Sequence, residues 1–96
     1  MGMDLDFYKN KSREFISNMR FHAASDEKFE MLSFATTTFK THAFEDSGVS
    51  VIEVPICKLH LLKDWLIKHR ETNWQYDSIL SYIEDIDCDI EILATW

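Results

Sequence analysis

The chain has 96 residues, 46% of them hydrophobic and 28% charged, and its 17 acidic residues against ten Lys and Arg give a net charge of −7 at pH 7. A chain of this length forms one domain, residues 1–96, and its apolar fraction excludes an intrinsically disordered protein. The negative charge disfavours direct binding to nucleic acid or to an anionic membrane, because both repel an acidic surface.

The N-terminal segment carries apolar residues at helical spacing. We expect a first helix that begins at Asp4 or Asp6, either of which is a suitable N-cap, and that ends near His22. The apolar face of this helix is predicted to contain Leu5, Tyr8, Phe15, Ile16 and Met19.

The segment from Phe29 to Phe44 fits two patterns. As a strand it places Phe29, Met31, Ala35 and Phe39 on one parity, and as a helix it places Phe29, Leu32, Thr36, Phe39 and Ala43 on one face, with Ser25 as a cap. We favour the strand, because the consecutive threonines at 36–38 are β-branched and prefer extended backbone.

A hairpin is predicted next. The polar residues at 45–47 and Gly48 have the composition of a turn, and Gly48 is free to adopt a positive φ. Val49 to Val54 is expected to form the second strand, paired with the strand before the turn.

Two helices are predicted to follow. Pro55 suits the first turn of a helix, and Thr72 to Gln75 match a capping box that begins another helix. The apolar stripe of the earlier helix comprises Ile56, Leu59, Leu62 and Leu66, widened by Leu61 and Trp65. The stripe of the later helix comprises Tyr76, Ile79, Leu80 and Ile83.

The C-terminal residues 85–96 show a period-two alternation of acidic and apolar side chains. Ile86, Cys88, Ile90, Ile92, Ala94 and Trp96 share one parity, and Asp85, Asp87, Asp89 and Glu91 share the other. Period-two alternation predicts a half-buried strand with a ladder of carboxylates on its outer face. The whole chain is therefore predicted to be an α+β domain of order α-β-β-α-α-β, with a three-stranded, mainly antiparallel sheet packed by helices.

Catalytic and cofactor motifs are not evident in the sequence. Cys57 and His60 have helical spacing, but no second pair completes a zinc site, and we expect neither metal nor cofactor. Neither a nucleophile elbow nor a glycine-rich phosphate loop occurs, so the sequence does not predict an enzyme. Five aromatic residues fall at spacings that predict core positions: Phe15, Phe29, Phe39, Trp65 and Trp74.

The cysteines Cys57 and Cys88 are expected to be buried free thiols. Two cysteines do not make a disulfide framework, and the N-terminus lacks the basic and apolar regions of a signal peptide. We therefore expect a cytoplasmic protein.

The acidic ladder suggests the function. Fixed carboxylates steer association with basic surfaces, so we expect a small inhibitor or immunity-like protein that binds a basic protein such as a nuclease or a toxin. The expected contact residues are Asp85, Asp87, Asp89 and Glu91, with Glu84 as a further candidate. The alternative is a self-assembling accessory or adaptor protein, for example a homodimer, whose acidic face is only solvated. A third hypothesis is a small enzyme or ligand-binding domain that uses Cys57, His60 and His69.

Overall fold

The computed structural model describes residues 2–10, 12–22, 26–44 and 48–95. Its core is a five-stranded antiparallel sheet of order β2-β1-β5-β4-β3, not the three-stranded sheet predicted from sequence. The elements in chain order are β1 (Met3–Lys9), β2 (Phe15–Phe21), α1 (Glu27–Thr38), β3 (Lys40–Phe44), β4 (Val49–Val54), the 3₁₀ turn η1 (Ile56–Lys58), α2 (Leu59–His69), α3 (Trp74–Ile83) and β5 (Ile90–Thr95).

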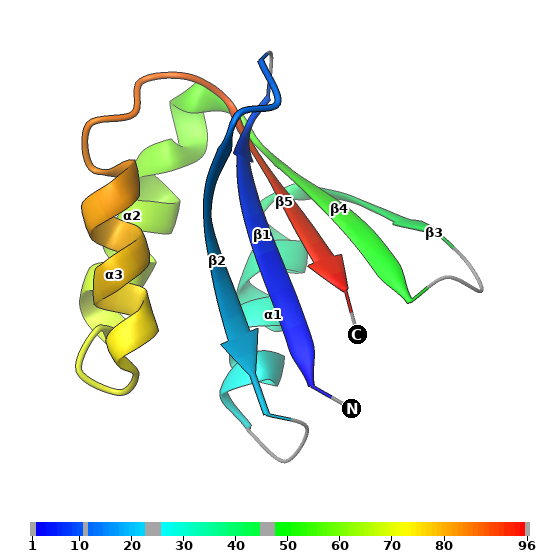
Figure 1. Ribbon diagram of the computed structural model, residues 1–96, viewed down its shortest axis with the longest axis vertical. Coiled ribbons are helices and arrows are strands. Elements are labelled where there is room, and N and C mark those ends of the chain that lie inside the picture. Colours follow the sequence, from blue (N-terminus) through cyan, green and yellow to red (C-terminus); the bar gives the residue numbers. More distant parts are fainter. Residues whose placement is uncertain (1, 11, 23–25, 45–47, 96) are drawn as a thin grey trace.

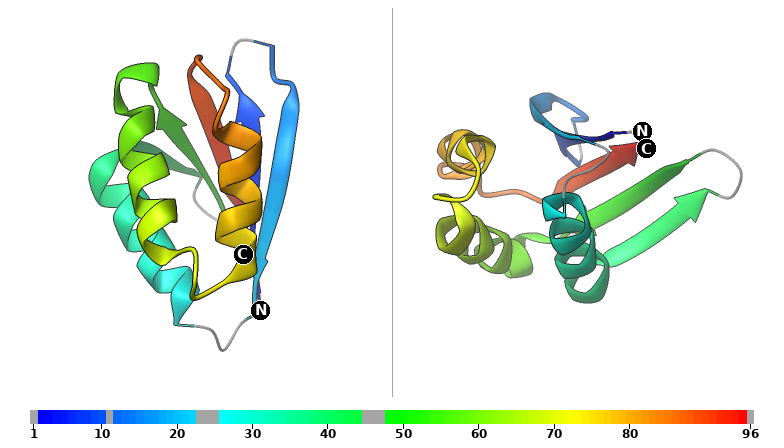
Figure 2. Two further views of the ribbon diagram at one scale, coloured as in Figure 1. Left: turned by 90° about the vertical axis from the view of Figure 1, so that its left-hand side faces the viewer. Right: turned by 90° about the horizontal axis from the view of Figure 1, so that it is seen from below.

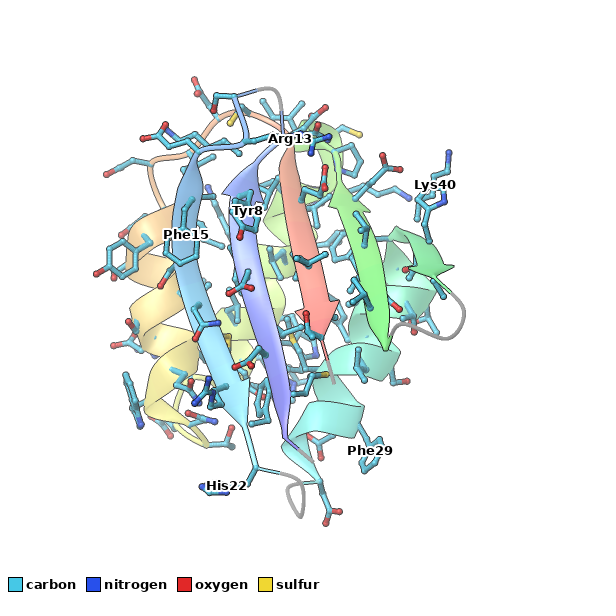
Figure 3. The ribbon with its side chains drawn as sticks, turned by 45° about the vertical axis from the view of Figure 1, so that its right-hand side comes forward. Tyr8, Arg13, Phe15, His22, Phe29 and Lys40 are labelled. Atoms are coloured by element: carbon cyan, nitrogen blue, oxygen red, sulfur yellow. The ribbon has the colours of Figure 1, made fainter. Side chains whose placement is uncertain are left out.

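The three helices all pack on one face of the sheet (Figures 1 and 2). Between helices and sheet lies a single hydrophobic core, to which β1 contributes Phe7, β5 contributes Ile92, and α2 contributes Leu62. The opposite face of the sheet carries none of these three helices, as Figure 3 shows with this face toward the viewer. We refer to it as the open face.

The predicted N-terminal helix is wrong, because this segment forms the hairpin β1–β2. Met3, Leu5 and Phe7 alternate with Asp4 and Asp6 along β1. The three apolar side chains are buried in the core. The apolar residues of this segment fit a period of two as well as a period of 3.6. Pairing of β1 with β5 decides between them, since β1 lies inside the sheet, between β2 and β5.

The predicted strand from Phe29 is also wrong in its first part. Residues 27–38 form α1, as the helical alternative proposed, and residues 40–44 form a strand, β3. The buried face of α1 differs from that alternative, since Met31 and Ala35 are buried whereas Phe29 and Thr36 are exposed. The threonines are accommodated because their hydroxyls bond within the helix: Thr36 Oγ1 donates to the carbonyl of Leu32 at 2.8 Å, and Thr37 Oγ1 to that of Ser33 at 2.7 Å.

The second half of the chain follows the predicted patterns closely. β3 and β4 form the expected hairpin, and Gly48 adopts φ 67° at its turn. Leu59, Leu62 and Leu66 of α2 are buried, as are three residues of the α3 stripe, Tyr76, Ile79 and Ile83. Two residues predicted in the stripe of the earlier helix are exposed instead: Ile56, which lies in η1 before α2 begins, and Leu61. The N-cap of α3 is Asn73, whose side chain accepts from the Gln75 amide at 2.9 Å. The predicted capping box therefore begins one residue too early.

The final strand is shorter than predicted. β5 begins at Ile90, and residues 84–89 form the connection from α3. The apolar parity is confirmed within the strand, since Ile90, Ile92 and Ala94 are buried. In the part of the chain that the structure describes, no helix is long and apolar enough to cross a membrane. The predicted cap Ser25, turn residues 45–47 and Trp96 lie outside the described residues.

Candidate binding surfaces

The carboxylates predicted to form one ladder occupy three different environments. Glu84, Asp85 and Asp87 are exposed in the connection between α3 and β5, where the chain has not yet become a strand. Only Glu91 lies in β5 itself. The structure therefore does not arrange these groups along one strand face.

Asp89 has a structural role, because it accepts hydrogen bonds from two other segments of the chain. Its Oδ1 accepts a hydrogen bond from the amide of Ile56 at 2.7 Å, which ties the start of η1 to the connection before β5. Its main-chain carbonyl accepts from the amide of Asn10 at 2.9 Å. A half-buried carboxylate engaged in this way is less available to a partner than Asp85 or Asp87.

Glu91 lies at the centre of the open face. Strand register places Tyr8 of β1 beside it on one side and Glu53 of β4 on the other. The outer strands extend this row with Phe15 beside Tyr8 and Lys40 beside Glu53. Two carboxylates directly opposite on neighbouring strands repel each other, so the Glu53–Glu91 pair is an unfavourable feature of the sheet itself.

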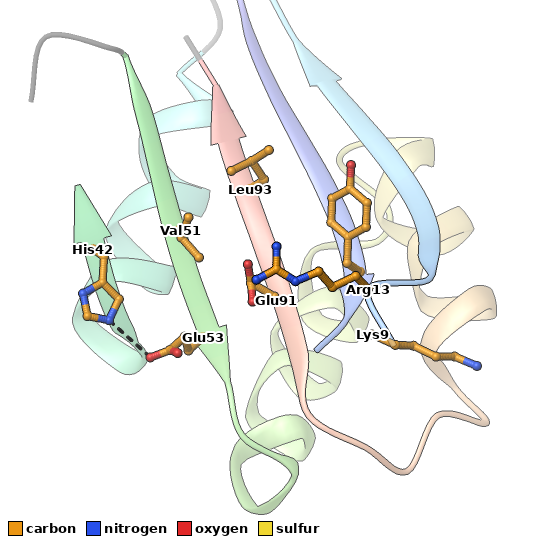
Figure 4. A pocket seen from close by; sticks show the side chains of 8 residues that line it. Lys9, Arg13, His42, Val51, Glu53, Glu91 and Leu93 are labelled. Carbon is orange, nitrogen blue, oxygen red and sulfur yellow. Dashed lines mark hydrogen bonds and ion pairs between the residues drawn. The ribbon is translucent and has the colours of Figure 1, made fainter. Parts of the chain in front are cut away.

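A hollow of about 520 Å³ lies around this row on the open face (Figure 4). Val51 and Leu93 contribute its apolar surface. It is lined by Tyr8, Lys9, Arg13, His42, Val51, Glu53, Glu91 and Leu93. Sequence reasoning missed this hollow, because its residues come from β1, β3, β4, β5 and the β1–β2 turn.

Most charged groups of the open face are already paired. Lys9 Nζ lies 3.3 Å from a Glu14 carboxylate oxygen, and His42 Nε2 lies 3.3 Å from Glu53 Oε2. Arg20 Nε donates to Asp4 Oδ1 at 2.8 Å, and this hydrogen bond and the charge of Asp4 raise the pKa of Arg20 above its usual value. Arg13 and Glu91 form no ion pair within the described part of the chain.

The exposed side of α3 forms a second surface. Trp74 is 78% exposed and Tyr82 is 57% exposed, and the spacing of Trp74, Asp77, Ser81 and Tyr82 places them on one side of the helix. Glu84, Asp85 and Asp87 follow directly in the chain. We call Trp74, Asp77, Tyr82, Glu84, Asp85 and Asp87 the acidic–aromatic surface.

The charge distribution is uneven along the chain. Residues 71–96 contain seven carboxylates and no Lys or Arg, so they account for the whole net charge of −7, and residues 1–70 hold ten acidic and ten basic residues. Five of these seven carboxylates, at positions 71, 77, 84, 85 and 87, are exposed. The negative field of the protein therefore originates mainly from α3 and its flanking segments.

Several predicted core positions are exposed instead. Phe15 and Phe29 are 55% and 62% exposed, and Trp74 is the most exposed large apolar residue of the described chain. Of the five aromatic residues, only Phe39 is fully buried, while Trp65 is half-buried and stacks on Phe34 and His69. The buried stripe of α3, read from Tyr76 onward, already leaves Trp74 on the other side of the helix, and this signal could have identified it.

The residues of the weaker ligand hypothesis are not gathered into a metal site. Cys57, predicted to be buried, is an exposed free thiol, and Cys88 is half-buried. His60 is exposed, whereas His69 stacks on Trp65 with 4.2 Å between ring centroids. No group of three or more His, Cys, Asp or Glu suited to a metal ion occurs among the residues that the structure describes.

Comparison of the chain with models of known protein families, with curated proteins and with solved structures found no match.

Proposed function

We propose that this protein is a non-catalytic binding protein whose acidic–aromatic surface engages a basic protein. The observation that supports the proposal most directly is the coincidence of two features in one segment of the chain. The excess negative charge is concentrated in residues 71–96, and the same segment exposes Trp74 and Tyr82.

These two features have complementary roles in binding. Exposed carboxylates raise the rate of association with a basic surface, while buried contact area comes from aromatic side chains, which dominate the energetics of many interfaces. Trp and Tyr truncations at interface centres typically cost about 2 kcal/mol or more of binding free energy. The acidic–aromatic surface has both kinds of group within a single helix and the connection that follows it.

The partner class follows from the charge. A surface rich in carboxylates repels the nucleic-acid backbone and attracts proteins that bind it, so a nuclease or a toxin with a basic active-site groove is the kind of partner we propose. Inhibition would result from covering that groove. We place this activity in the cytoplasm, a location that the free thiols of Cys57 and Cys88 favour.

The proposed contribution of each contact residue differs from the one predicted from the sequence. Asp85, Asp87 and Glu84 keep their proposed role because they are exposed. Asp89 and Glu91 become secondary, since Asp89 holds Ile56 and Glu91 lies on the open face. Trp74 joins the surface as the proposed aromatic anchor.

The test compares three baits in affinity capture from native lysate. The first is the natural protein, the second carries Asp77→Asn, Asp85→Asn and Asp87→Asn, and the third carries Glu14→Gln, Glu30→Gln and Asp64→Asn. The two variants make the same change in net charge, and all six residues are exposed. The proposal expects a basic protein that the natural bait and the third bait retain and the second bait loses.

The captured protein is then used in purified form. The association rate constant of the captured protein should be about tenfold lower with the second bait than with the natural protein. It should also depend less strongly on salt concentration with the second bait, as expected for electrostatically steered binding. Trp74→Ala should instead mainly raise the dissociation rate constant. Equal capture by all three baits contradicts the proposal.

The alternative function is self-association through the free edge of the sheet. The edge strand β3 pairs only with β4, whereas α3 covers part of the other edge strand, β2. An adaptor that assembles by adding a second copy at β3 would show a concentration-dependent mass in sedimentation experiments, and His42→Pro would abolish it. A constant monomer mass over a wide concentration range contradicts this alternative.

A further inference from the structure

The hollow on the open face is lined by one cation and one anion that form no ion pair within the described residues. Among the side chains that line it, Lys9 pairs with Glu14, and His42 Nε2 lies 3.3 Å from Glu53 Oε2. Arg13 and Glu91 remain without an ion-pair partner among the described residues. Figure 4 shows the guanidinium of Arg13 reaching from the β1–β2 turn toward β5, where Glu91 stands.

The backbone of Arg13 is unusual. Its φ of 54° lies in the left-handed region, and it is the one non-glycine residue with positive φ in the described chain. For a residue with a Cβ this conformation is disfavoured, and glycine or asparagine would be the ordinary choice in such a turn. Backbone strain of this kind is concentrated at functional sites, where the strained residue holds a side chain in place.

Two carboxylates on one side of the hollow repel each other. Glu91 and Glu53 are half-buried and directly opposite each other, so their charges repel. Among the described residues, His42 Nε2 lies 3.3 Å from Glu53 Oε2 and forms no ion pair with Glu91. A positively charged group placed beside Glu91 would relieve the repulsion.

The remaining lining is apolar. Val51 and Leu93 are opposite each other on β4 and β5, and the ring of Tyr8 lies beside Glu91 in the strand register. Together they offer an apolar contact area next to the two unpaired charges. A volume of about 520 Å³ is within the usual size of small-molecule sites.

We propose that this hollow binds a small zwitterion of the amino-acid type with an apolar side chain. The ligand's ammonium group pairs with Glu91 and screens it from Glu53, its carboxylate accepts hydrogen bonds from the Arg13 guanidinium, and its side chain packs on Val51 and Leu93. This site is on the open face and is independent of the acidic–aromatic surface of α3.

The test uses leucine and phenylalanine as probes, each with two analogues that carry a single charge. Isopentylamine and phenethylamine lack the carboxylate, and isocaproate and hydrocinnamate lack the ammonium group. Binding is followed by amide chemical-shift changes in the full chain. We expect saturable shifts at Arg13, Glu91 and Leu93 with at least one amino acid, no shift at Trp74, and affinities about tenfold lower for both of its analogues, since each loses one charged contact.

Variants distinguish binding in the hollow from nonspecific electrostatic attraction of the amino acid to the protein surface. Arg13→Gln and Glu91→Gln should each weaken binding of the zwitterion about tenfold. Arg20→Gln is the matched control, because Arg20 is on the same face but pairs with Asp4 outside the hollow. The chemical-shift dispersion of each variant reports that it is folded, and Arg13→Lys, which keeps the charge, should recover part of the affinity.

Three results would overturn the proposal. These are the absence of saturable shifts with both amino acids, equal affinity for zwitterions and singly charged analogues, and an equal loss of affinity in Arg20→Gln. Because none of these measurements involves a protein partner, their failure leaves the proposed protein-binding function unaffected.

Discussion

The side-chain amide of Gln75 and the main chain of Arg20 form a two-bond clamp between α3 and the outer edge of β2. Gln75 Oε1 accepts from the Arg20 amide at 2.7 Å, and Gln75 Nε2 donates to the Arg20 carbonyl at 2.8 Å. An exposed edge strand is a template for pairing with another chain, and this clamp occupies part of that edge. The glutamine that the sequence pattern assigns to a capping box thus protects the sheet instead.

Gln75→Ala should lower the free energy of unfolding by about 1–2 kcal/mol, because two hydrogen bonds to the main chain are lost. The uncovered edge of β2 should also promote association. Urea denaturation and light scattering over a range of concentrations test both effects. Ser81→Ala, an exposed change on the same helix, is the control and should leave both unchanged within about 0.5 kcal/mol. A monomeric, equally stable Gln75→Ala variant would show that the clamp has no protective role.

Asp89→Ala should destabilise the protein by about 1.5–3 kcal/mol, since the Ile56 amide loses a charged hydrogen-bond acceptor. Asp89→Asn should cost less, because its amide oxygen can still accept. The comparison variant is Asp87→Ala, at an exposed position of the same connection, for which we expect a change below about 0.5 kcal/mol. Chemical denaturation of the three variants measures the free energy of unfolding. Equal destabilisation by Asp87→Ala and Asp89→Ala would refute the structural role of Asp89.

Glu91→Gln should raise the free energy of unfolding by about 0.2–1 kcal/mol at low salt, because it removes the repulsion from Glu53 across the strand pair. The gain should shrink as salt screens the two charges. Glu84→Gln, which removes an exposed charge outside the sheet, serves as control. Loss of stability in Glu91→Gln at every salt concentration would mean that Glu91 has a stabilising contact.

Arg13→Gly should be neutral or stabilising by up to about 1 kcal/mol, since glycine adopts a positive φ without strain but loses more entropy on folding. Arg13→Val should be destabilising, because a β-branched residue is disfavoured at this φ. Thermal unfolding of the two variants measures the difference. Equal stability of the Gly and Val variants would contradict a left-handed conformation at this position.

The periodicity of apolar residues predicts the secondary structure correctly in segments that fit a single period. Leu59, Leu62 and Leu66 of α2, Tyr76, Ile79 and Ile83 of α3, and the alternation of Ile90, Ile92 and Ala94 agree with the predicted buried faces, because each segment fits one period; Ile56 and Leu61, predicted in the same stripe as Leu59, are exposed. Residues 5–19 fit two periods, and the long-range pairing of β1 with β5 selected the strand. In α1 the helix was favoured over intrinsic threonine preference once Met31 and Ala35 could be buried in the core.

The mixed α+β class, the hairpin around Gly48 and the concentration of negative charge after Arg70 can be read from the sequence, because composition and short-range spacing are local properties. The five-stranded sheet, the use of Asp89 as a hydrogen-bond acceptor for Ile56 and the placing of Arg13 and Glu91 around one hollow become evident only in the folded chain. They depend on pairings between segments far apart in the sequence, and the spacing of residues within one segment does not specify its partner strand.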